Sequence, residues 1–109
     1  MSNPLRRTPE TIRERLLQSM PVGTSKEEVL EVIRENEWEL IHANDNGGVA
    51  MANIVEGGSW EESIGEQSIR AILGRYGIRP VRYLVEAWWA FDENGELIDV
   101  FVRRTTTFR

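Results

Sequence analysis

Residues that could support catalysis are few in this sequence. His42 is the only histidine, and the chain has no cysteine to act as a nucleophile or as a thiolate ligand. A metal site needs several such ligands at short, regular spacings, and none surrounds His42. Because His42 precedes an Asn/Asp/Gly turn, its side chain is expected to be solvated or to cap a backbone group. We therefore expect no metal and no cofactor.

Three glutamates, Glu61, Glu62 and Glu66, lie close enough in sequence to supply a general acid and a general base. They follow Gly57-Gly58, however, and acidic residues next to a glycine pair are typical of an exposed loop. Neither this pair nor Gly47-Gly48 has the strand-to-helix context of a phosphate-binding loop. The chain is therefore expected not to be an enzyme, with a small hydrolase as the remaining alternative.

The charge of the chain argues against nucleic acid as a partner. The 109 residues carry a net charge of −5, whereas nucleic-acid affinity rests mainly on Lys and Arg neutralising phosphates. Two local groups of arginines are interpreted as solvated strand edges and a tail: Arg70, Arg75, Arg79 and Arg82, then Arg103, Arg104 and Arg109. No apolar run approaches the length of a membrane span, and no secretory signal is recognisable. A cytoplasmic protein with no membrane partner is expected.

Two capped helices are predicted in the N-terminal third. Residues 1–7 resemble a flexible arm, after which Thr8 and Pro9 supply an N-cap and a first-turn proline for a helix that ends at Pro21. A second helix is expected over 26–36, because Ser25 begins a capping box ahead of an apolar run. Each apolar stripe is narrow, so the two helices together can cover one face of a small sheet.

The middle segment, 37–67, gives weaker signals. Residues 38–41 could form a short strand and residues 49–55 another, on either side of a turn. Trp38 is expected in the core. Trp60 stands among glycines and glutamates, where it is either an interface anchor, a role that favours tryptophan, or a staple that folds back over its own loop.

The C-terminal third predicts an antiparallel meander. Segments 68–76, 81–91 and 96–107 are rich in β-forming residues and are separated by turn sequences. The fold class predicted is α+β, with two N-terminal helices packed on one face of a three- to four-stranded antiparallel sheet. Residues 8–109 would form this single domain.

Two short motifs lie in the order of a known superfamily. Gly23, Ser25 and Val29 match a Gly-Thr/Ser-x-x-x-Val helix start with one extra residue, and Phe-Asp-x-x-Gly-x-Leu is present at 91–97. The chain thereby resembles the small outer-membrane-assembly lipoproteins and the related β-lactamase inhibitor protein domains. It has no cysteine to acylate, so the resemblance implies the fold rather than the membrane-assembly role. It also implies an open sheet face and loops that bind a protein without a cofactor.

The last two strands carry apolar residues on both faces, because successive side chains of a strand point oppositely. A short hairpin loop would set Asp92 opposite Glu96. The cross-strand pairs then expected are Phe91–Leu97 and Ala87–Phe101 on one face, and Trp88–Val100 and Glu86–Val102 on the other. Since the helices cover only one face, the other is expected to be an exposed apolar patch.

This patch predicts binding to another protein. Its residues, with Trp60 from the loop, are the predicted site: Leu84, Glu86, Trp88, Ile98, Val100 and Val102. The expected function is a non-catalytic protein-binding module, such as an inhibitor or immunity-type protein acting on a cognate partner. The alternatives are a homodimeric structural domain and complete burial of this face within the chain. An acidic chain would favour a basic partner.

Overall fold

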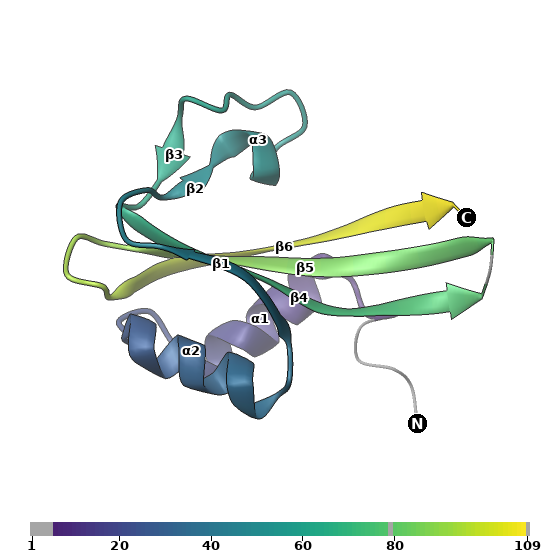
Figure 1. The fold of residues 1–109 in the computed structure, drawn as a ribbon, viewed down its shortest axis with the longest axis horizontal. Helices are drawn as coiled ribbons and strands as arrows, with labels where there is room; N and C mark the ends of the chain where they lie inside the picture. The colour runs from purple at the N-terminus through teal and green to yellow at the C-terminus, as the bar shows by residue number, and fades with distance from the viewer. Residues whose placement is uncertain (1–5, 79, 109) are drawn as a thin grey trace.

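The computed structural model describes residues 6–78 and 80–108 (Figure 1). The predicted arm falls largely in 1–5, outside the described residues. The chain forms an α+β fold with these elements in order: α1 (Pro9–Ser19), α2 (Lys26–Glu35), β1 (Glu39–Asn44), β2 (Val49–Ala50), α3 (Met51–Ile54), β3 (Ser63–Ile64), β4 (Gln67–Ile78), β5 (Val81–Phe91) and β6 (Leu97–Phe108).

Side-chain caps begin both predicted helices. The Thr8 hydroxyl accepts a hydrogen bond from the Thr11 N–H at 3.2 Å, and the Ser25 hydroxyl accepts one from the Glu28 N–H at 3.2 Å. Each bond satisfies a backbone donor that has no partner inside its helix. Both helices are confirmed, with ends one or two residues from those predicted.

The main sheet has four strands in the order β1-β4-β5-β6, and all neighbours are antiparallel. The predicted meander is confirmed as β4, β5 and β6, while β1 and β6 form the two edges. The strand expected at 49–55 is wrong for most of its length: β2 ends at Ala50 and α3 follows. β2 pairs with β3 in a second, two-stranded sheet that the sequence did not predict.

The pairing of β5 with β6 departs from the prediction at a β-bulge. Phe91 pairs with Leu97 as predicted, but Ala90 pairs with Asp99, so Ile98 is an extra residue. Beyond it the predicted partners are wrong by one residue, as the observed pairs show: Ala87–Val102, Trp88–Phe101, Trp89–Val100 and Glu86–Arg103. A one-residue shift moves side chains to the opposite face. Val100 and Val102 therefore share the face of Trp89 and not that of Trp88.

The larger hydrophobic core joins both N-terminal helices to the sheet. Trp89 and Phe91 are fully buried, and the Trp38 ring lies 6.2 Å from that of Trp89, which confirms Trp38 as a residue that packs on the core. α1 packs beside the edge strand β6, and the Arg13 side chain donates a hydrogen bond to the Val100 carbonyl at 2.8 Å. The helix residues buried in this cluster are Ile12, Leu16, Val29 and Ile33.

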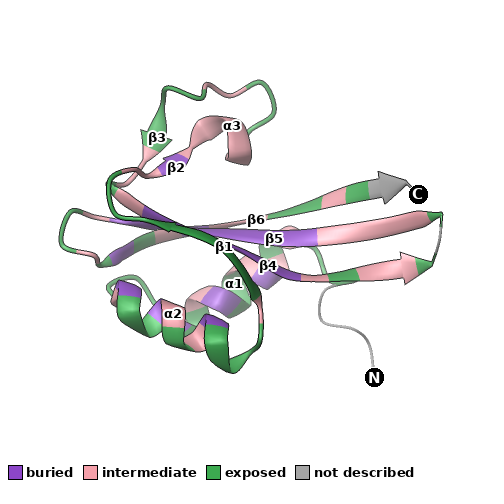
Figure 2. Ribbon diagram, in the orientation of Figure 1, coloured by how far each residue is buried: buried purple, intermediate pink, exposed green. Residues whose placement is uncertain are grey.

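A second, smaller core lies on the other face of the sheet. Residues 49–64, named here the flap, contribute Val49 to a cluster with Trp88 and Ala90. Trp88 is only 3% exposed, and β5 is buried from Val85 to its end at Phe91 (Figure 2). The prediction that Trp88 and Val100 lie in an exposed patch is therefore wrong, since the flap covers Trp88 and the larger core takes Val100.

Gly48, just before the flap, allows the backbone to pass close to the backbone of Ile64 and Gly65. A Cβ at Gly48 would lie 2.2 Å from the Ile64 carbonyl oxygen, which is backbone and cannot rotate away. Gly48→Ala is therefore expected to break the β2–β3 pairing and expose Trp88, seen as faster amide exchange in 49–64 and altered tryptophan fluorescence. Gly47→Ala is the control, because its Cβ would meet only the Asn44 side chain. Equal exchange in both variants would contradict this account of the flap.

Candidate functional site

The described residues contain no constellation for metal binding. No group of three or more His, Cys, Asp or Glu side chains in 6–78 and 80–108 could hold a metal ion. His42 is exposed on β1, and Glu61, Glu62 and Glu66 are exposed, as the sequence predicts. Within the same residues, no helix is long and apolar enough to cross a membrane.

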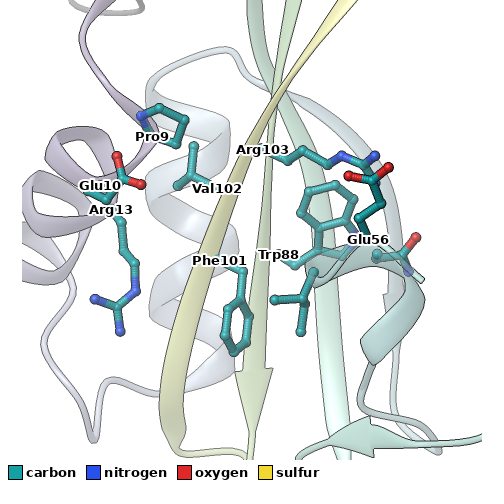
Figure 3. Close-up of a pocket in the computed structure, with 10 residues that line it drawn as sticks. Pro9, Glu10, Arg13, Glu56, Trp88, Phe101, Val102 and Arg103 are labelled. Atoms are coloured by element: carbon teal, nitrogen blue, oxygen red, sulfur yellow. The ribbon is translucent and has the colours of Figure 1, made fainter. Parts of the chain in front are cut away.

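A pocket of about 330 Å³ opens between the first turn of α1, α3 and strands β5 and β6 (Figure 3). Trp88 and Val102, both predicted site residues, line it together with charged side chains from each side. Figure 3 shows the Arg103 side chain reaching toward the Glu56 carboxylate above Trp88. The other lining residues are Pro9, Glu10, Arg13, Asn53, Ile54 and Phe101. The lining combines apolar side chains with side chains of both charges.

The remaining predicted site residues do not form one surface. Glu86 is buried and accepts hydrogen bonds from Arg70 Nε at 2.9 Å and Nη2 at 2.5 Å. Leu84 is half-buried farther along β5, and Ile98 is exposed at the bulge. Trp60 is 74% exposed, so the expectation that it staples its loop is wrong. Its role as an interface anchor stays a prediction.

The outer edge of β1, beside an apolar groove, was not predicted from the sequence. All six residues of β1 are exposed, and no described strand pairs with its outer side. A groove of about 480 Å³ runs between α2 and the start of β1. Apolar side chains from both elements line it: Leu30, Ile33, Trp38 and Leu40. Leu40 is 46% exposed, so its side chain is accessible from solvent at the groove.

Two glutamates, Glu27 and Glu31, line this groove, and they belong to an acidic stretch of the chain. Residues 27–39 hold six glutamates and one arginine, a net charge of −5 that equals the charge of the whole chain. The one arginine, Arg34, forms an ion pair with Glu31. Glu39 lies 3.8 Å from Arg75 on the neighbouring strand. Outside this stretch the chain has no net charge, so the acidity is local to α2 and β1.

The composition of β1 gives a weak indication that its edge is open, because the strand has only six residues. Edge strands are usually blocked by lysine, proline, a β-bulge or a covering element. The pairing of β1 with β4 has an irregularity between Leu40 and His42. The β1 sequence, Glu-Leu-Ile-His-Ala-Asn, has neither lysine nor proline. The groove itself could not be read from the sequence, because its walls come from a helix and a strand whose packing the pattern does not specify.

No protein-family model matches the chain, and comparisons with curated proteins and with solved structures find no match. The resemblance to the outer-membrane-assembly lipoproteins and β-lactamase inhibitor domains therefore rests on the two short motifs alone. The site has to be interpreted from its own geometry.

Proposed function

We propose that this chain is a non-catalytic protein-binding module that takes an extended segment of its partner along β1. The observation that supports it is the fully exposed edge strand beside an apolar groove. An edge strand offers backbone N–H and C=O groups to an added strand, and alternate side chains of that strand then enter neighbouring pockets. In this proposal α1 and α2 cover one face of the sheet, and α2 also forms a wall of the groove.

The charge around the groove defines the chemistry of the partner. An apolar side chain suits the surface of Leu30, Trp38 and Leu40, whereas the net charge of −5 over 27–39 favours Lys or Arg on either side of it. Complementary charge would mainly raise the association rate and add specificity. An inhibitor or immunity-type protein that engages a basic cognate partner in the cytoplasm would use this surface.

A homodimer is the second candidate, because the same open edge could pair with β1 of another copy. Two copies of the acidic stretch 27–39, each with a net charge of −5, would then be brought close together, and like charges across an interface oppose association. A foreign, basic segment is therefore the better fit. Sedimentation of the wild-type chain distinguishes the two, since a dimer that dissociates when β1 is altered would support self-association.

The substitution Leu40→Glu tests the proposal with a capped peptide of alternating Val and Leu flanked by lysines. It is expected to weaken peptide binding by about tenfold or more, because it places an unpaired carboxylate in the apolar groove. Folding should change by less than about 0.5 kcal/mol, since the side chain is already half exposed. Fluorescence anisotropy and denaturant unfolding measure the two effects.

Val22→Glu is the matched control for this test, because Val22 is 67% exposed in the connection between α1 and α2. It adds the same charge outside the groove and should leave peptide affinity within about twofold of wild type. Docking along β1 would be refuted if the peptide failed to bind the wild-type chain, or if both variants bound it equally.

A further inference from the structure

Arginines from two distant stretches of sequence come together on one face of the sheet. Arg75 pairs with Leu84, and Arg103 pairs with Glu86, so all four side chains lie on the face that also carries the flap. Arg70 pairs with Trp88 on that face, and Arg82 lies two residues before Leu84. We name the part of this face beyond the flap the arginine face: Arg70, Arg75, Arg82 and Arg103 around Leu84.

The strands that build the arginine face carry no acidic residue in their far halves. Stretches 74–85 and 100–108 contain no Asp or Glu, although the whole chain has 18 acidic residues against 13 basic ones. The positive charge is therefore concentrated in these strand halves, and Glu39 of the acidic stretch meets it at Arg75. This local positive charge attracts a different kind of partner from the acidic stretch 27–39.

Four of the described acidic residues lie near the arginines of this face. Glu86 binds Arg70, and Glu39 lies 3.8 Å from Arg75, which is too long for a strong ion pair. Glu10 and Glu56 line the pocket that Arg103 also lines. Arg75 and Arg103 are both exposed, so their guanidinium groups are accessible from solvent.

We propose that the arginine face is a second docking surface, which binds an acidic segment of a protein partner. Guanidinium groups bind carboxylates through two parallel hydrogen bonds, and arginine is enriched at protein interfaces. The whole chain carries a net charge of −5, which opposes binding to a long, continuous phosphate backbone and favours a short acidic segment of a protein over nucleic acid. The inference stands on this face alone and does not depend on docking along β1.

The test uses a fluorescent capped peptide of alternating Glu and Leu. Wild-type protein is expected to bind it with an affinity that falls as NaCl is raised from about 50 to 300 mM. The double variant Arg75→Glu/Arg103→Glu is expected to weaken binding by about tenfold or more. The variant Arg15→Glu/Arg34→Glu makes the same change in net charge on exposed helix positions and should bind within about twofold of wild type.

Leu40→Glu separates this inference from the proposed function. It should leave the acidic peptide bound as in the wild type, whatever its effect on the lysine-flanked peptide. The inference would be overturned if the two double variants lost affinity equally, which would indicate a net-charge effect, or if neither lost any. Tighter binding of duplex DNA than of the acidic peptide at the same salt would also overturn it. Thermal unfolding of each variant confirms that the comparison is made on folded protein.

Discussion

Trp88→Ala is expected to lower the free energy of unfolding by about 3–5 kcal/mol, the range for truncating a buried aromatic side chain. Trp88 is 3% exposed between the sheet and the flap, and the Arg70 guanidinium lies 5.2 Å from its ring centroid. Alanine would leave a cavity in the smaller core and remove the surface on which the flap packs. Denaturant unfolding followed by circular dichroism measures the loss.

Trp60→Ala is the matched control, because Trp60 is 74% exposed on the flap and should cost less than about 0.5 kcal/mol. Sedimentation of both variants completes the test. If Trp88→Ala were as stable as wild type but altered the association state, Trp88 would lie between chains and not within one. That result would contradict the packing of the flap.

Arg70→Ala is expected to destabilise the fold by about 3 kcal/mol, because it leaves the Glu86 carboxylate buried without its partner. The Glu86 side chain is 8% exposed, whereas that of Arg70 is 33% exposed, so the expected value is at the lower end for a buried pair. The loss of the contact with Trp88 adds to it. Denaturant unfolding again gives the magnitude.

The double variant Arg70→Ala/Glu86→Gln shows whether the ion pair is the cause. Replacing the unpaired Glu86 carboxylate with a neutral amide should recover a large part of the lost free energy of unfolding, which a double-mutant cycle measures. Purely additive effects of the two substitutions would mean that the side chains do not interact. The stabilising effect of Arg70 would then come from its packing against Trp88.

Local signals were sufficient to predict much of the fold. Thr8 and Ser25 marked the helix starts, because a capping side chain acts within a few residues of its own position. Gly95 and Asp92 marked the last hairpin, where the Asp92 N–H donates to the Glu96 carbonyl at 2.9 Å. These features depend only on neighbouring residues, so they can be read without knowing the packing.

The missed features depend on contacts between distant residues. The bulge at Ile98 left no trace in the alternation of β6, since residues on both faces of that strand are apolar. β2 and β3 are two residues long each, too short for a periodic pattern. The prediction of an exposed patch was wrong for both reasons. The bulge places the Val100 side chain in the larger core, and the flap covers Trp88.

The site proposed from the structure illustrates the same limit. Leu30 and Leu40 carry no signal of a groove in the sequence, because only the packing of α2 beside β1 brings them together. Arg75 and Arg103 are visible as members of basic stretches, but the antiparallel register is what places them on one face. Their charge could be counted from the sequence, whereas their common surface could not.

The measurement that tests the central proposal most directly is amide hydrogen exchange of the wild-type chain with and without the lysine-flanked peptide. Strand addition should slow exchange in 39–44, where backbone N–H groups on the outer side of β1 gain partners. Shifts of the Trp38 indole signal should accompany it, since Trp38 lines the groove. Protection confined to the flap or to Trp60, with β1 unchanged, would contradict the account.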